Sequence, residues 1–332
     1  MRVLVTGATG FVGSHLVEAL LARGDDVVGL IRSPTKAARV FTERKPEVVE
    51  GDLGNHAALR RAADGADAVF HAAALTSART RAEFFAANVT GTQHVLDAVR
   101  DAAPRLHRLV YVSSIAAAGP SSRGMPVTED AEPRPVSDYG ASKLAGEQAV
   151  RQSGLPWTVV RPPAVYGPRD VELRRVFSFA RWRVAPVFGD GRQELSLIHV
   201  EDLVSALLAA LDRGRPEGIY FAAHPEVVTS AEFVAAVGRA VTEVLHGRAR
   251  DPRLVLRVPF GVARAALTMN GAVLHALGRS TVLSADKIPE LLAEAWTCSA
   301  AALERDTGWR AAIGTVDGLR STAAWYRDAG WL

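Results

Sequence analysis

Cysteine is almost absent from this chain: Cys298 is the only one among 332 residues. A lone thiol cannot close an internal disulfide, and no second sulfur is available to build a structural zinc site. His199 has no histidine or cysteine at ligand spacing either, so we expect no bound metal. The lack of disulfides is typical of a reducing compartment, and we expect the protein to be cytoplasmic.

Lysine is nearly as scarce, with four of the 39 basic residues, so that 35 arginines carry most of the positive charge. These arginines are spread along the chain, and 36 acidic residues reduce the net charge to +3. Because no basic stripe is present, we do not expect nucleic acid as a partner. The excess of arginine favours only a small anionic ligand.

Long uncharged apolar runs are missing as well, so we expect no membrane span. The nearest approach, residues 260–278, contains Arg264 and His275. We interpret it as an amphipathic helix that packs in a small lobe or covers an apolar pocket as a lid; a helix lying on a membrane surface is the alternative. A strand-like run begins two residues after Met1, which leaves no room for a targeting peptide.

Short valine-rich runs alternate with helical stretches through the first half of the chain. The predicted strands are 2–6, 27–31, 48–50, 68–71, 109–113 and 158–161, and the predicted helices are 12–23, 55–63, 83–101 and 140–153. This alternation predicts an α/β fold, with a doubly wound parallel sheet of Rossmann type over residues 1–166. Residues 167–332 should form mainly a smaller C-terminal α/β substrate lobe. A strand and helix over 195–213 are expected to return to the sheet, and a cleft between the two parts is the expected site.

A glycine-rich loop, Thr6-Gly-Ala-Thr-Gly-Phe-Val-Gly13, connects the first predicted strand to the first predicted helix. In such loops one glycine permits the tight turn, a second lets the backbone approach a pyrophosphate, and a third lets the helix pack on the sheet. The helix start then presents free N–H groups to the phosphates. The loop therefore predicts a dinucleotide site.

The end of the second strand, Gly29-Leu-Ile-Arg-Ser33, lacks the acidic residue that usually binds the ribose 2′-hydroxyl of NAD. Arg32 stands there instead, with Lys36 a turn later, and a guanidinium suits the 2′-phosphate of NADP. NAD stays possible if Arg32 only stacks on the adenine. Asp52, at the end of the third strand, either accepts a hydrogen bond from the adenine amino group or caps the helix that begins near Asn55.

Tyr139 and Lys143 lie four residues apart on a predicted helix and therefore share one face. A free tyrosine has a pKa near ~10, and a nearby cation favours its phenolate. The pair is thus a candidate proton shuttle for hydride transfer. Ser113 and Ser114 end the preceding strand, at the sheet edge where ligands bind. We choose Ser114 as the hydroxyl that binds a substrate carbonyl oxygen.

These segments together resemble the extended short-chain dehydrogenase/reductase family, in its epimerase/dehydratase-like branch. The matching motifs are the glycine loop, His71-Ala-Ala-Ala74, Asn88-Val-Thr-Gly-Thr92, Ser113-Ser114, Tyr139 with Lys143, Arg161-Pro-Pro-Ala-Val-Tyr-Gly167 and His199-Val-Glu-Asp202. They follow the family's order over residues 1–202, and Leu303-Glu-Arg-Asp-Thr-Gly-Trp309 is similar too.

The resemblance implies that Ser114, Tyr139 and Lys143 are the catalytic residues and that Asn88 is mostly structural. The expected cofactor-binding residues are Gly7, Thr9, Gly10, Phe11, Val12, Arg32, Asp52, Leu53, Ala72, Ala73, Ala74, Tyr139, Lys143, Pro162 and Val165. The family also implies a homodimer through the helices near 83–101 and 140–153. The candidate faces are Phe84, Phe85, Val95, Leu96, Leu144 and Val150, which would otherwise only cover the sheet.

Departures from the family pattern distinguish between its branches. Ile115 follows Ser114 where dehydratases carry an acidic residue, so we do not expect dehydration. Ala164 and Leu195 stand where nucleotide-sugar epimerases usually carry Asn and a diphosphate-binding Arg, although Arg192 lies near enough to substitute. The remaining motifs look more like the 3β-hydroxysteroid dehydrogenase and dihydroflavonol reductase relatives.

We therefore predict an NADP-dependent oxidoreductase. It would transfer a hydride between nicotinamide and a ketone or secondary alcohol of a mainly apolar small molecule, with Tyr139 as general acid or base. The first alternative is a nucleotide-sugar 4-epimerase that retains NAD tightly. The second is a non-catalytic cofactor-binding subunit, which would have no need of the intact serine, tyrosine and lysine.

Overall fold

A computed structural model of the chain describes residues 1–262, 264–265, 268 and 287–332. Its main feature is a seven-stranded sheet in the order β10-β6-β5-β4-β1-β2-β3, in which every neighbouring pair is parallel. The strands are β1 (Arg2–Thr6), β2 (Asp26–Ile31), β3 (Glu47–Glu50), β4 (Ala68–His71), β5 (Arg108–Val112), β6 (Trp157–Arg161) and β10 (Gly218–Phe221). The predicted parallel sheet is therefore confirmed.

Helices cover both faces of this sheet. One face carries α1 (Phe11–Arg23), α9 (Val200–Arg213) and α13 (Ala301–Thr307), and the other carries α3 (His56–Ala63), α5 (Gly91–Ala102) and α7 (Asp138–Arg151). Each face has its own apolar core, because strands buried on both sides bring apolar side chains to both. The remaining helices near the sheet are α2 (Pro34–Val40), α4 (Arg81–Phe85) and α6 (Ile115–Ala118).

The helix predicted over 83–101 is interrupted. A five-residue π-helix (Ala86–Thr90) joins α4 to α5. Asn88 lies in this π-turn, where its amide donates to the Leu75 carbonyl at 3.0 Å and accepts from the Leu75 N–H at 2.8 Å. The same amide donates to Ser142 Oγ on α7 at 2.9 Å. Asn88 therefore fixes the chain after β4 to α7.

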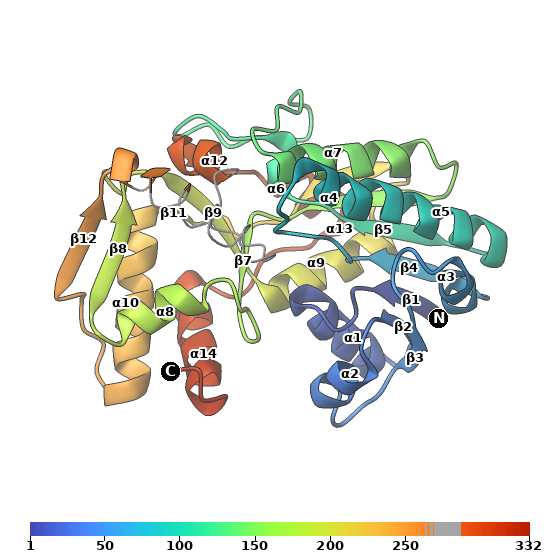
Figure 1. The fold of residues 1–332 in the computed structure, drawn as a ribbon, viewed down its shortest axis with the longest axis horizontal. Helices are drawn as coiled ribbons and strands as arrows, with labels where there is room; N and C mark the ends of the chain where they lie inside the picture. Colours follow the sequence, from blue (N-terminus) through green and yellow to red (C-terminus); the bar gives the residue numbers. More distant parts are fainter. Residues whose placement is uncertain (263, 266–267, 269–286) are drawn as a thin grey trace.

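The small lobe, at the left of Figure 1, contains two further sheets. A four-stranded sheet combines β7 (Ala164–Tyr166), β9 (Glu194–His199), β11 (Val227–Thr229) and β13 (Ala295–Trp296), and a parallel pair consists of β8 (Val184–Phe188) and β12 (Leu254–Val258). The helices of the lobe are α8 (Arg174–Ala180), α10 (Ser230–His246), α12 (Ile288–Leu292) and α14 (Thr315–Asp328). A capping box of Thr229 and Glu232 begins α10.

The strand expected to return to the main sheet together with its helix does not do so. α9 packs against α1 and the main sheet, but β9 pairs with β7, β11 and β13. The reason is that β9 ends at His199 and α9 begins at Val200. A helix on the face of a sheet needs a loop of about 2–6 residues after the strand that precedes it. The next strand, β10, joins the main sheet beside β6 instead.

Part of the apolar segment 260–278 lies outside the described residues, which include 260–262, 264–265 and 268 of it. Its assignment as lid, packing helix or membrane-surface helix therefore stays a prediction. Elsewhere in the described part of the chain, no helix combines the length and the apolar character that a membrane crossing requires.

Candidate functional site

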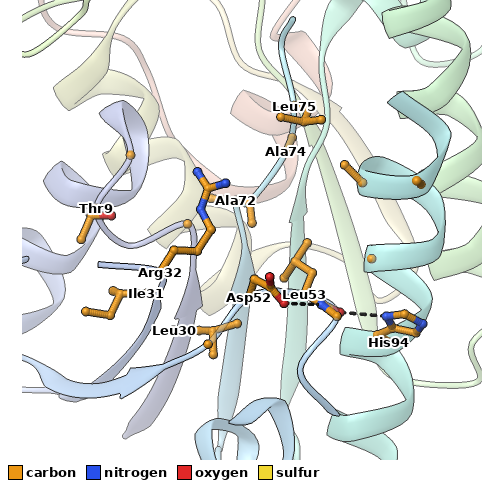
Figure 2. Close-up of a pocket in the computed structure, with 18 of the residues that line it drawn as sticks. Thr9, Leu30, Ile31, Arg32, Asp52, Leu53, Ala72, Ala74, Leu75 and His94 are labelled. Atoms are coloured by element: carbon orange, nitrogen blue, oxygen red, sulfur yellow. Dashed lines mark hydrogen bonds between the residues drawn. The ribbon is translucent and has the colours of Figure 1, made fainter. Parts of the chain in front are cut away.

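A cavity of about 560 Å³ opens at the carboxyl ends of β1, β2, β3 and β4 (Figure 2), and we call it the glycine-loop cavity. Nine of the predicted cofactor-binding residues line it: Gly7, Thr9, Gly10, Arg32, Asp52, Leu53, Ala72, Ala73 and Ala74. The structure does not place Phe11, Val12, Pro162, Val165, Tyr139 or Lys143 among the residues that line this cavity. Lining residues that sequence reasoning did not select include Leu75, Glu83, Gly91 and His94.

The glycine loop has the geometry that its sequence predicts. Gly7 has a φ of +71°, and a Cβ there would lie 2.8 Å from the Ala73 nitrogen. A Cβ on Gly13 would collide with the Gly7 carbonyl, so this glycine lets α1 approach the loop. α1 begins after Gly10 with no capping side chain and no acidic residue in its first turn. Its first N–H groups are therefore available to an anion.

Arg32 projects its guanidinium into the glycine-loop cavity (Figure 2). No hydrogen bond or ion pair of this side chain is present within the described residues. Ser33 caps α2 by accepting from the Lys36 N–H, and Lys36 also lines the cavity. Two basic side chains thus meet at the end of β2 without an acidic residue at that strand end.

Asp52 faces the glycine-loop cavity and does not cap α3. Its carboxylate accepts from the Gly54 N–H at 2.9 Å and lines the cavity. The cap of α3 is Asn55, whose side chain accepts from the Ala58 N–H. The adjacent Leu53 carbonyl is bound to His94 Nδ1 at 2.8 Å (Figure 2), which holds this loop on α5.

Ser114 and Tyr139 come together beside the end of β5. Ser114 caps α6 by accepting from the Ala116 N–H, and its side chain also hydrogen-bonds Tyr139. Burial raises the pKa of Tyr139, the Ser114 hydrogen bond lowers it, and the charges of Glu172 and Glu290 raise it again. The lowering of this pKa by Lys143 that the sequence predicts is therefore not seen, because desolvation by burial dominates.

Lys143 is buried below Tyr139 on α7. Its Nζ donates to the Val112 carbonyl at 2.8 Å and lies 4.3 Å from the centre of the Tyr111 ring. Burial lowers the pKa of Lys143 to about 7, although the charge of Glu147 opposes this. The ammonium group therefore titrates near neutrality, which is far below the ordinary range of a lysine.

Glu147 is a site residue that sequence reasoning missed. It forms a buried ion pair with Arg161, with oxygen–nitrogen distances of 2.9 and 2.6 Å, and accepts from Ser113 Oγ at 2.5 Å. The network joins α7 to the ends of β5 and β6. It also separates the two serines, because Ser113 is engaged here whereas Ser114 faces Tyr139. The signal was present in the sequence: Glu147 continues the four-residue spacing of Tyr139 and Lys143.

His71 is a structural residue. Its Nδ1 contacts Thr6 Oγ1 at 2.7 Å, and its Nε2 contacts Thr92 Oγ1 at 2.9 Å. Burial, with the charge of Lys143, lowers the pKa of His71 to about 3. The ring is therefore neutral at physiological pH and ties β1 to α5.

A second lysine covers the other side of Tyr139. Lys287 Nζ lies 4.6 Å from the centre of the Tyr139 ring and pairs with Glu290 at 2.9 and 3.0 Å. Glu290 also accepts from Ser137 Oγ, the cap of α7, at 2.5 Å. No short-range signal links these residues to Tyr139, because they come from the far end of the chain.

A second cavity, of about 890 Å³, lies in the small lobe and is called the small-lobe cavity. Most of its lining is apolar, with Val171, Leu173, Val176, Phe179, Pro186, Val187, Phe188, Leu195, Phe233, Val234, Phe260, Leu291, Leu292 and Ala293. Thr76 lines this cavity and Leu75 lines the glycine-loop cavity, so the two are neighbours. Glu172, whose charge acts on Tyr139, also lines it. Tyr139 lines neither cavity, but the charge of Glu172 reaches it from the small-lobe cavity, which places it near their junction.

Comparisons with known proteins agree with this geometry. The model of the NAD dependent epimerase/dehydratase family matches residues 3–223. The chain is 36% identical to a ceramide reductase of Caulobacter vibrioides, over 99% of this chain and 96% of that protein. It is 34% identical to the 4-hydroxy-2-methyl-3-oxo-4-farnesyl-3,4-dihydroquinoline-1-oxide ketoreductase of Stigmatella aurantiaca, over 83% and 82%.

A solved structure is similar over the whole chain. The dTDP-glucose 4,6-dehydratase DesIV of Streptomyces venezuelae, with NAD and TYD bound, has a TM-score of 0.78 and 27% identity, covering 100% of this chain and 98% of that one. The relatives therefore include reductases and a nucleotide-sugar enzyme.

Proposed function

The chain belongs to the NAD dependent epimerase/dehydratase family, and from this premise we propose an NADP-dependent reductase that interconverts a ketone and a secondary alcohol on a mainly apolar molecule. The family resemblance found in the motifs is confirmed, and with it an NAD(P)-dependent enzyme that acts on CH–OH and C=O groups. The observation that carries the proposal is the large, mainly apolar small-lobe cavity, whose lining residue Glu172 lies close enough to Tyr139 for its charge to act on the pKa of that tyrosine.

The glycine-loop cavity fits a dinucleotide cofactor. Two features suit a pyrophosphate: the close backbone packing that Gly7 permits, and the start of α1, which has no capping side chain. Arg32 and Lys36 suit an added 2′-phosphate, which is why we propose NADP over NAD. When bound, this cofactor supplies the hydride-transfer chemistry.

The chain's own residues supply the proton and hold the substrate oxygen. Tyr139 is protonated at neutral pH because burial raises its pKa, and it donates its hydroxyl proton to the oxygen of the ketone. Ser114 Oγ donates a hydrogen bond to the same oxygen and stabilises its negative charge. Lys143 lies one turn further along α7 and, as the family resemblance implies, would bind the nicotinamide ribose.

The small-lobe cavity determines the substrate class. Its lining is mainly apolar, with Arg123 and Arg175 among its polar members, and Leu195 occupies the position where epimerases usually carry an arginine. Arg192, which could have substituted for it, is exposed and does not line the cavity. The names of the two reductases include ceramide and a farnesyl group, which both contain long apolar chains. We propose a ketone that carries such a chain.

One experiment tests the cofactor and the substrate class together. Mass spectrometry of the purified protein identifies the nucleotide that it retains, and NADPH oxidation is then followed with ketones of increasing chain length. We expect NADPH consumption that becomes more efficient with chain length and no interconversion of UDP-glucose and UDP-galactose. Retained NAD with interconversion of these sugars, and no NADPH consumption, would establish the epimerase alternative instead.

The homodimer and the cytoplasmic location also remain part of the proposal. Four of the six candidate dimer residues, Phe84, Val95, Leu96 and Val150, are buried within the single chain. Val95, Leu96 and Val150 pack in the core beneath the sheet and Phe84 lies beside Tyr139, so a dimer would have to use other side chains of α5 and α7.

A further inference from the structure

An apolar surface runs along the outer margin of the small lobe. Six side chains form it, Phe179, Trp182, Leu254, Val255, Leu256 and Phe260, and we call it the apolar edge. Trp182 is 76% exposed, and the three consecutive residues of β12 are each at least 50% exposed. Successive strand residues point to opposite faces, so within the described residues neither face of β12 is fully covered. A group of exposed apolar side chains that includes a tryptophan is typical of an interaction site.

The six residues are continuous in space. The Arg183 carbonyl accepts from the N–H groups of Arg253 and Leu254 at 2.8 and 3.1 Å, which brings Trp182 next to the start of β12. One turn earlier, the Phe179 carbonyl accepts from the Trp182 N–H at 3.0 Å. At the other end of β8 the Phe260 ring lies over Gly189. Figure 1 shows β12 and β8 at the outer margin of the small lobe.

The surroundings of the apolar edge are positively charged. Arg175, Arg181, Arg253 and Arg257 are exposed, and in the described part of the chain no carboxylate pairs with any of them. Residues 173–189 contain no Asp or Glu at all. The nearby Asp251 is already paired with Arg239. Exposed tryptophan and phenylalanine ringed by unpaired arginines match the boundary between the headgroups and the acyl chains of an anionic bilayer.

We propose that the apolar edge docks on the surface of an anionic lipid bilayer. Trp182 and the β12 side chains would enter the interface while the arginines bind lipid phosphates. The edge also continues into the small-lobe cavity, because two of its members, Phe179 and Phe260, line that cavity together with Arg175. If the substrate is a long-chain ketone, as proposed above, it could pass from the bilayer to the cavity without crossing water. Docking itself does not depend on that reaction.

Vesicle flotation with the full-length protein tests the docking. Vesicles of phosphatidylcholine alone are compared with vesicles that contain phosphatidylglycerol, at low and high salt. We expect flotation with the anionic vesicles that weakens as salt rises. The double variant Arg181→Gln/Arg253→Gln should lower the apparent affinity about 25-fold, since each basic residue contributes about fivefold. Trp182→Ser/Val255→Ser should lower it at every salt concentration.

Matched controls come from the other half of the molecule. Val48 is exposed on the edge strand β3 as Val255 is on β12, and Arg105 is an exposed arginine far from the lobe in sequence. Val48→Ser and Arg105→Gln should float like the unmodified protein. Unchanged thermal unfolding midpoints show that the variants are folded.

Three results would overturn the proposal. The first is no flotation of the unmodified protein at low salt, and the second is equal losses in the β3 and β12 variants. The third is a protein that does not bind vesicles and whose mass in light scattering falls when Trp182 is replaced by Ser. In that case a second copy of the chain, and not a bilayer, would cover the apolar edge. Docking without reduction of any ketone would leave this proposal standing and reject the proposed function.

Discussion

The glycine-loop cavity and the small-lobe cavity are built from different kinds of structure. The first is formed by the ends of buried parallel strands and by a backbone turn that only glycine adopts easily. The second is formed by apolar side chains from short strands and helices that come from distant parts of the sequence. Cofactor binding is therefore specified by local backbone geometry, whereas substrate choice depends on side chains that can vary without disturbing the sheet.

The junction of the two cavities gives the largest expected effect. Tyr139→Phe removes one hydroxyl and keeps the ring, so the fold and cofactor binding should survive. The rate of ketone reduction should fall by about 10²–10⁴, which is the contribution of general acid–base catalysis. Single-turnover measurements with bound NADPH would quantify it.

Two companion variants define the result. Ser114→Ala should lower the rate alone, and Lys143→Ala should lower both the rate and the cofactor affinity. A Tyr139→Phe protein with near-normal turnover would mean that another group supplies the proton.

The next prediction compares how much a buried ion pair beside the main sheet and an exposed ion pair in the small lobe contribute to the free energy of unfolding. Arg161→Met leaves the Glu147 carboxylate buried without its partner, which should cost about 3–5 kcal/mol of unfolding free energy. Arg239→Met breaks the exposed pair with Asp251 in the small lobe and should cost about 1 kcal/mol or less. Urea denaturation of both variants measures the difference. If Arg161→Met does not fold, Glu147→Gln replaces it in the comparison, because it keeps the shape of the side chain and removes its charge. A loss of unfolding free energy equal to that of Arg239→Met would refute the contrast.

Cofactor choice should respond to a single side chain of the first cavity. Arg32→Ala should reduce the preference for NADP over NAD by about 1–3 kcal/mol, the range for hydrogen bonds to a charged group. Titration calorimetry with both nucleotides measures it. Equal affinities of the unmodified protein for NADP and NAD would remove the basis of this prediction.

The smallest effect is expected in the second cavity. Phe260→Ala removes a ring that is 40% exposed at the cavity wall, so it should raise KM for long-chain ketones about two- to tenfold. The KM for a short ketone, which does not reach the ring, should not change. A uniform change for both chain lengths would show that Phe260 acts on the fold instead.

The same division explains what the sequence could predict. The strands of the main sheet, their parallel pairing and the glycine loop follow from valine runs and glycines that are close together in the chain. Glu147 was predictable from its spacing after Lys143, whereas Lys287 reaches Tyr139 only through the tertiary fold. The placement of β9 was predicted wrongly, because strand patterns carry no information about the sheet that a strand joins.

Because of the π-turn that contains Asn88, the number of residues between α4 and α5 determines how α4 is oriented beside the site. α4 precedes this turn, and its Phe84 ring lies 6.1 Å from the Tyr139 ring, centre to centre. One residue of an α-helix corresponds to about 100° of rotation. Deleting a single residue between 86 and 90 would restore a regular helix but rotate α4 by that angle relative to α5, carrying Phe84 away from Tyr139. Among related chains, a one-residue gap at this point would therefore mark a reshaped wall beside the reacting tyrosine, even if every residue that touches substrate were the same.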